Sequence, residues 1–311
     1  MSTNAGKPTW GSIGSQTVQL FRTEFPVYFS PVLLASTIAY ICVYLLELIR
    51  EEFVPKPIIP SFVGHSNTAI PNFLILLGKA LVWTVECWVV WLAFTIVLAM
   101  VSLRMLQQRQ FPDGRIPISG IFQQILKGHL GVLAGISGLA GLSTALFNTF
   151  LIPLLLKPLP YLMFRLHLFD SYFIVRKCAV VALTLVFAAL ISKITLAVPE
   201  LVEDPNVIFE HALRNSDKAT TGWEGFFLLE CISYGLLGGV LYFAGNEFIR
   251  SSWKSGRLTL QGYEIMLAAF TILLASLIIL LVIIAHSLLY ISLKYSNVSL
   301  PAEATDMQLE N

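Results

Sequence analysis

The sequence predicts an all-α polytopic membrane protein with about six transmembrane helices and about three short helices at the membrane surface. Of its 311 residues, 56% are hydrophobic and only 13% are charged, whereas a soluble domain carries about 25% charged residues. The mean hydropathy is +0.75, and long apolar runs alternate with polar segments that hold most of the prolines. The net charge of +1 gives no electrostatic support for a nucleic-acid partner.

Six apolar runs are long enough to cross a bilayer, which needs about 20 mostly apolar residues. They are Val27–Ile49, Phe73–Leu103, Leu130–Leu156, Cys178–Val198, Phe226–Phe248 and Tyr263–Leu293. The second and the sixth exceed what a bilayer requires, so we expect these two helices to tilt or to protrude. The chain is then a single integral membrane domain over residues 1–311, with a polar C-terminal tail at 294–311.

The topology follows only in part from the sequence. The N-terminus has no apolar core of a signal peptide, so we expect the first span to act as an uncleaved anchor. An even number of spans places both termini on the same side of the membrane. The basic residues divide equally between the two sides, and the positive-inside rule therefore gives no orientation.

Three short amphipathic helices are predicted to lie flat at the interface, each ahead of a pair of spans. The first lies in "TWGSIGSQTVQLFRTEF" and the middle one in "RIPISGIFQQILKGHLG", behind Pro117. For the third, Asp204 is predicted as the N-cap and Pro205 as the first helical residue. This pattern predicts pseudo-repeats of one flat helix and two spans at about 9–103, 116–198 and 204–293.

Each predicted flat helix carries a basic residue at a matching position. These residues are Arg22, Lys127 and Arg214, which are candidates for contact with lipid phosphate. The alternative is that the three helices only surround the bundle. The segment Tyr161–Lys177 mixes apolar and charged residues. It is predicted as an interfacial or protruding helix, although it could also lengthen the fourth span.

A run of motifs around the fourth span points to a family. Lys193 lies late in the span, "LAVP" ends at Pro199, and Glu203 follows. "ALRNS" at 212–216 and "TTGW" at 220–223 come next. This run resembles the membrane domain of bacterial glycerophosphoryl diester phosphodiesterases and the stand-alone inner-membrane relatives of that domain. Two departures are Asp217, where the family has an aromatic or basic residue, and Trp223, which comes one position early.

The resemblance implies a multi-pass module of the bacterial cytoplasmic (inner) membrane, with the N-terminus in the cytoplasm. The chain has no His-Arg-Gly motif and no room for a phosphodiesterase barrel, so the resemblance does not carry that activity over.

Ionisable residues inside apolar runs are candidate functional residues. Lys79 and Glu86 lie seven positions apart on the second span, hence on one face, and each would need a partner on another helix. Lys193 and His286 lie late in the fourth and sixth spans. The alternative to a proton or substrate contact is a structural hydrogen bond between helices.

The third span carries Gly131, Gly135, Gly138 and Gly141. Their spacing predicts close packing against a neighbouring helix, and it also allows self-association or binding to another membrane subunit. The four cysteines lie in or beside apolar runs without metal-ligand spacing, so we predict neither a disulfide framework nor a metal site, and no cofactor.

Four carboxylates lie in "AVPELVEDPNVIFEHALRNS". Glu210 is predicted to pair with Arg214 one helical turn on, while Glu200 and Glu203 have no predicted role. Because no reaction-competent cluster is evident, the leading hypothesis is a non-enzymatic scaffold or lipid-organising module that associates with membrane lipids. The alternative is a small transporter that uses Glu86, Lys79 and His286. A lipid-modifying enzyme would need a catalytic cluster that the sequence does not offer.

Overall fold

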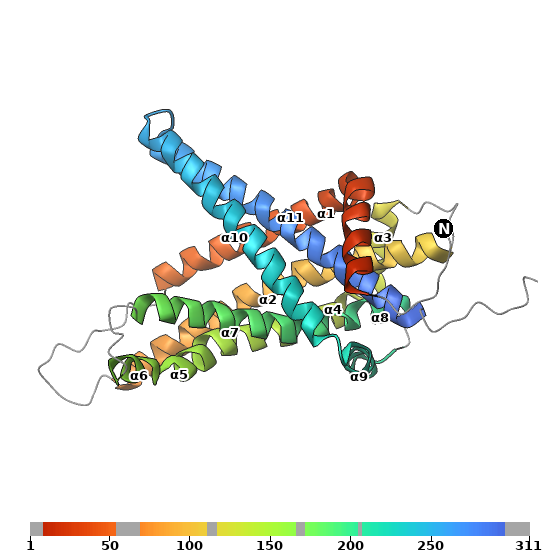
Figure 1. The fold of residues 1–311 in the computed structure, drawn as a ribbon, viewed down its shortest axis with the longest axis horizontal. Helices are drawn as coiled ribbons and strands as arrows, with labels where there is room; N and C mark the ends of the chain where they lie inside the picture. Colours follow the sequence, from red (N-terminus) through yellow and green to blue (C-terminus); the bar gives the residue numbers. More distant parts are fainter. Residues whose placement is uncertain (1–8, 54–68, 111–116, 166–171, 205–206, 296–311) are drawn as a thin grey trace, which may run out of the picture.

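The computed structural model describes residues 9–53, 69–110, 117–165, 172–204 and 207–295, and these residues are almost entirely helical (Figure 1). The elements in chain order are α1 (Trp10–Phe53), α2 (Ala69–Gln110), α3 (Ile118–Gly128), α4 (Leu130–Leu146), the π-helical turn η1 (Phe147–Leu151), α5 (Ile152–Leu156), α6 (Leu159–Arg165), α7 (Tyr172–Thr195), α8 (Ala197–Glu203), α9 (Phe209–Thr220), α10 (Glu224–Lys254) and α11 (Leu260–Tyr295). The described residues form 6 helical stretches long and apolar enough to span a membrane. The predicted all-α polytopic fold is confirmed.

The helix α2 forms the centre of the bundle and packs against α1, α4 and α11. Every residue from Val97 to Leu103 is buried. This stretch of α2 is therefore enclosed by other helices on all sides. By contrast, α10 exposes large apolar side chains such as Phe243 and Phe248, as expected for a helix that faces lipid.

The predicted first flat helix is not a separate element, because α1 runs without a break from Trp10 to Phe53. It contains Pro26 and Pro31, each of which removes a backbone donor and favours a kink. Figure 1 shows the red N-terminal part of α1 lying across the direction of the orange remainder. The helix therefore changes direction near the two prolines but does not end there.

The other two predicted short helices are separate. The helix α3 begins behind Pro117 and buries Ile121 and Ile125, as the sequence pattern predicts. On the same predicted face, Phe122 and Leu126 remain 40% and 38% exposed.

The predicted start of the third short helix is wrong. Asp204 is the C-cap of α8, with an extended backbone, and its N–H donates to the Glu200 carbonyl at 3.1 Å. The next helix, α9, starts only at Phe209 behind Ile208, whose side chain makes no capping hydrogen bond. Pro205, the predicted first helical residue, lies outside the described residues.

The fourth span, predicted at Cys178–Val198, falls within a helical stretch at Val175–Glu203 that is divided into two helices. The helix α7 stops at Thr195 and the separate helix α8 starts at Ala197. Pro199 cannot donate to the Thr195 carbonyl, and its ring would clash with that carbonyl in a continuous helix. Pro199 therefore interrupts the hydrogen bonding of the helix, and α8 begins after the single turn residue Leu196. The ambiguous segment Tyr161–Lys177 divides between the end of α6 and the start of α7, with residues 166–171 outside the described part.

The helices at the ends of the spans gather together. Figure 1 shows the N-terminal part of α1, together with α3, α8 and α9, at the right-hand end of the bundle. The last turn of α11 reaches the same end, whereas the connection between α10 and α11 lies at the far upper left.

Candidate functional site

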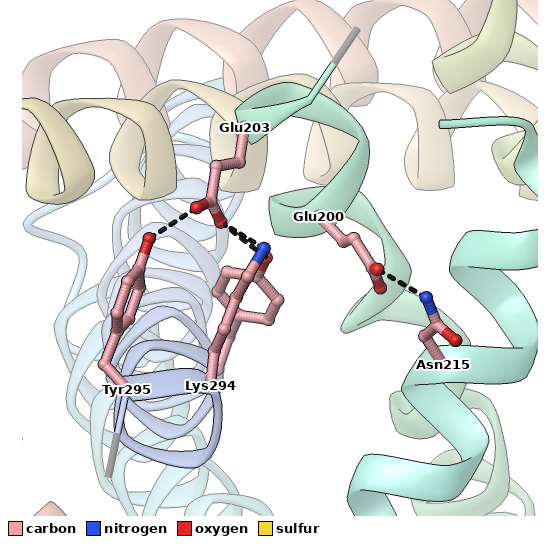
Figure 2. A network of polar contacts seen from close by, with 6 residues as sticks. Glu200, Glu203, Asn215, Lys294 and Tyr295 are labelled. Atoms are coloured by element: carbon pink, nitrogen blue, oxygen red, sulfur yellow. Dashed lines mark hydrogen bonds and ion pairs between the residues drawn. The ribbon is translucent and has the colours of Figure 1, made fainter. Parts of the chain in front are cut away.

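Glu203, the last residue of α8, binds three side chains of the last turns of α11 (Figure 2). Its Oε2 atom accepts hydrogen bonds from the Tyr290 hydroxyl at 2.6 Å and the Lys294 ammonium at 2.9 Å. Its Oε1 atom accepts a further hydrogen bond from the Tyr295 hydroxyl. Lys294 also donates to the Tyr290 oxygen at 3.0 Å, so these four groups form one connected network.

The backbone explains why these groups meet. Tyr290 and Lys294 lie four residues apart and share one face of α11, and Glu203 reaches that face from the end of α8. The Arg109 guanidinium of α2 lies 4.1 Å from the centre of the Tyr295 ring, a cation–π contact. The network therefore connects α2, α8 and α11 at one end of the bundle.

A cavity of about 160 Å³ lies beside this network, between α8, α9 and α11. Glu200 and Asn215 line one side of it, and Tyr290 and Lys294 line another. The Asn215 amide donates to the Glu200 carboxylate at 2.8 Å, as Figure 2 shows. Both carboxylates to which the sequence assigned no role thus connect helices, Glu200 to α9 and Glu203 to α11.

The sequence candidate His286 lies in a second polar chain, which is buried. Its Nε2 atom is 3.0 Å from Oε2 of Glu230 on α10, and its Nδ1 atom is 3.0 Å from the Thr195 hydroxyl on α7. His286 is 1% exposed and Glu230 is 7% exposed. Glu230 stands in an apolar run in "LLECISYG", which is the signal that sequence reasoning missed.

The geometry is consistent with a hydrogen bond on each side of the imidazole. The Thr195 hydroxyl also lies 2.7 Å from the Ser192 carbonyl, so it can donate there and accept from Nδ1. The contact between His286 and Glu230 requires one proton, held by either Nε2 or the carboxyl.

The other intramembrane candidate, Glu86, pairs with another helix as predicted. It is 6% exposed, and its Oε1 atom lies 3.7 Å from Nη1 of Arg50 on α1. The sequence did not identify Arg50 as the partner. The side chains of Lys79 and Lys193 lie outside the described part of the structure. Neither Glu86 nor His286 lines any of the four cavities described here.

A large apolar groove lies between α1 and α2, with α3 at one end. Its volume is about 690 Å³, and it extends from Ser30 to Cys42 along α1 and from Val89 to Met100 along α2. Ile118, Ser119 and Phe122 of α3 line the same groove. Its walls are almost wholly apolar, so its chemistry suits a hydrocarbon chain rather than a polar substrate.

The three candidates for contact with lipid phosphate, Arg22, Lys127 and Arg214, are all exposed. The predicted pair on α9 is present, with Arg214 Nη2 at 2.6 Å from Glu210 Oε1. Contact between the three basic residues and lipid phosphate stays a prediction.

The four glycines of the third span divide into two pairs. A Cβ atom on Gly141 would lie 2.8 Å from the backbone of Trp88, and one on Gly138 would lie 3.9 Å from the Trp88 ring. This pair packs against α2 within the chain, and Ser137 supports the same contact through a 2.7 Å hydrogen bond to Thr95. Gly131 and Gly135 are exposed and have open space around them.

Comparison with known proteins yields no family model, curated protein or solved structure that matches this chain. The family resemblance of the motifs around Pro199 and Glu203 therefore stays a prediction.

Proposed function

We propose that this protein is a non-enzymatic membrane module that binds and organises lipid. The groove between α1, α2 and α3 is the single observation that carries this proposal. A location in the bacterial cytoplasmic membrane, with both termini on the cytoplasmic side, belongs to the same proposal. So does assembly with other membrane subunits or with a second copy through the open glycines Gly131 and Gly135.

The length of the groove supports an acyl chain as its occupant. Ser30 and Cys42 are 12 residues apart on α1, which is roughly 18 Å at a rise of 1.5 Å per residue. Half of a typical hydrocarbon core is about 15 Å thick. The groove therefore matches one leaflet, and it begins beside α3, at the end of the bundle where the short helices gather.

The alternative of a small transporter has less support. A transport path needs polar groups along an accessible cavity. Glu86 is paired with Arg50, and His286 lies between Thr195 and Glu230. The largest described cavity is apolar and contains neither residue.

Retention of lipid by the purified protein tests the proposal. Val89→Trp fills the deep end of the groove, and Ser119→Trp blocks the end beside α3, while Val240→Trp on the exposed face of α10 is the matched control. We expect native mass spectrometry to show phospholipid bound to the wild type and to Val240→Trp. Both groove variants should lose it. Equal retention by all four proteins would contradict the proposal.

A further inference from the structure

The cavity between α8, α9 and α11 has a polar wall that remains accessible. Glu200 of α8 and Asn215 of α9 line it; Asn215 is exposed and Glu200 is half-buried. One water molecule needs about 10–15 Å³ of cavity volume. The cavity of about 160 Å³ therefore has room for a polar group of several atoms beside these two side chains.

The hydrogen bonding of this wall leaves acceptors. The Asn215 amide nitrogen donates to Oε1 of Glu200 at 2.8 Å. A carboxylate only accepts hydrogen bonds, so the amide must turn its nitrogen toward Glu200, and its oxygen stays available as an acceptor. Oε2 of Glu200 has no hydrogen-bond or ion-pair partner among the described residues. Two oxygen atoms on the wall of the cavity can therefore accept hydrogen bonds from a ligand.

The charges around the cavity favour a cation at these oxygens. The Lys294 ammonium on the opposite wall lies 2.9 Å from Oε2 of Glu203, so the charge of this lysine is already matched. Glu200, by contrast, has only the neutral amide of Asn215 as its partner. Within the described part of the chain, the cavity wall thus carries one carboxylate without a cation, which attracts positive charge.

The number and type of groups on the wall indicate which cation fits. Ca²⁺ takes 6–8 oxygen ligands in proteins, and Glu200 and Asn215 offer two. A quaternary ammonium is recognised by several aromatic faces, whereas Tyr290 is the single aromatic residue described on this wall. A primary ammonium carries three N–H donors. It can therefore donate to both oxygens of the wall.

The depth of the cavity favours a lipid as the source of the ammonium group. Glu200 comes two positions after Val198, at which the fourth apolar run ends. Lys294 directly follows Leu293, at which the sixth run ends. The cavity therefore lies where the hydrocarbon core gives way to the headgroup region. Leu196 and Leu293 give it apolar walls beside the polar one, as suits a molecule with both characters.

We propose that this cavity binds the primary ammonium group of a phospholipid headgroup, as in phosphatidylethanolamine, with Glu200 and Asn215 as its acceptors. The site rests on the proposed lipid-binding function and adds a headgroup preference to it. It is separate from the apolar groove, since α8, α9 and α11 form the cavity and α1, α2 and α3 form the groove.

Competition between two phospholipids with the same acyl chains tests the site. The cavity holds only a headgroup, so its lipid exchanges during purification and is measured with lipid added back to the full chain. Native mass spectrometry counts the lipid bound from an equal mixture of phosphatidylethanolamine and phosphatidylcholine. Choline has no N–H group to donate. We expect the wild type to bind about tenfold more of the ethanolamine lipid.

Two variants identify the acceptors. Glu200→Gln removes the negative charge and keeps the size of the side chain, and Asn215→Leu removes the amide oxygen. Both should bring the preference toward equal binding of the two lipids. Glu210→Gln is the matched control, because it removes the same charge from the exposed face of α9, and it should leave the preference unchanged. Equal losses in Glu200→Gln and Glu210→Gln would overturn the site, because surface charge would then select the lipid.

Free ethanolamine tests the source of the ammonium group. At the same concentration as the lipid it should not displace the lipid, because it lacks the acyl chains. Displacement would show that the cavity takes a free amine, which overturns the assignment to a lipid headgroup.

The outcomes separate the cavity from the groove. Purified Ser119→Trp, in which the groove is blocked, should still prefer the added ethanolamine lipid. Equal binding of the two lipids by the wild type would overturn the ammonium site and leave the groove intact. A wild type that binds neither lipid would overturn both proposals. The wild-type comparison needs no variant, so it decides the question even if a variant fails to fold.

Discussion

Nε2 of His286 and Oε2 of Glu230 lie 3.0 Å apart inside the bundle and share one hydrogen bond. The two residues come from α11 and α10, and Thr195 of α7 fixes the other side of the imidazole. Three spans are thus connected through one buried polar chain.

Removal of one member of the His286–Glu230 pair should therefore lower the free energy of unfolding substantially. We expect His286→Ala to destabilise the protein by about 3 kcal/mol, because it leaves Glu230 buried without a partner. The double variant with leucine at both positions should recover much of this loss, since it removes both polar groups. Thermal unfolding in detergent measures both effects. If the single and double variants unfold at the same temperature, the coupling between His286 and Glu230 does not exist.

The hydrogen-bond network at Glu203 predicts that its members contribute unequally to stability. Tyr290→Phe should lower the free energy of unfolding by about 1 kcal/mol, because it removes one hydrogen bond. Glu203→Ala should lower it more, since it leaves three donors without their acceptor. Denaturant unfolding measures the cost, and hydrogen exchange in α8 and the last turn of α11 should locate it. Glu210→Gln is the control, because its exposed pair with Arg214 contributes little. An equal effect of Glu210→Gln and Glu203→Ala would contradict the prediction.

The close approach of α4 to α2 predicts a difference between two glycines of the same helix. Gly141→Ala should destabilise the protein by about 1–3 kcal/mol, because the new methyl group would lie 2.8 Å from the Trp88 backbone. Gly131→Ala should be neutral in the monomer, because that position faces open space. Thermal unfolding of the two variants tests this directly. A neutral Gly141→Ala would show that the two helices lie further apart than the structure has them.

A pH dependence is expected at His129, which lies between α3 and α4. Burial lowers the pKa of this imidazole below its usual value of 6.5, because it disfavours the charged form. The unfolded chain therefore takes up the proton first as the pH falls. The contribution of His129 to stability is complete above about pH 6.5 and is lost as the pH falls through its folded-state pKa.

Titration of labelled histidine by NMR measures this pKa in the folded protein. His129→Gln should remove the corresponding part of the pH dependence of unfolding. A folded-state pKa at or above 6.5 would be incompatible with the burial of this side chain.

The spans could be predicted from the sequence because each needs a long apolar run, and that property is local. The short helices were harder to delimit. Pro26 and Pro31 bend α1 without ending it, whereas Pro199 separates α7 from α8. The residue type alone does not distinguish these outcomes, because neighbouring helices decide whether a broken backbone bond is tolerated.

At the candidate sites, the sequence likewise identified some of the residues but not their partners. His286 and Glu86 stood out as polar residues in apolar runs, but their partners Glu230 and Arg50 are distant in the chain. Glu203 had no predicted role because its partners are separated from it by 87 residues or more. Tertiary packing alone brings these groups together.

The third span contacts a different neighbouring helix before the π-helical turn η1 than within it. Before it, Thr144 accepts a hydrogen bond from the Trp91 indole of α2 at 3.0 Å. Within it, Phe147 stacks on Phe187 of α7 with ring centres 4.0 Å apart. One extra residue in a helix rotates everything that follows by about 100°. This rotation allows one continuous helix to pack against both α2 and α7. A single-residue deletion in η1 would rotate one part of the helix relative to the other, so that the two contacts could not form together.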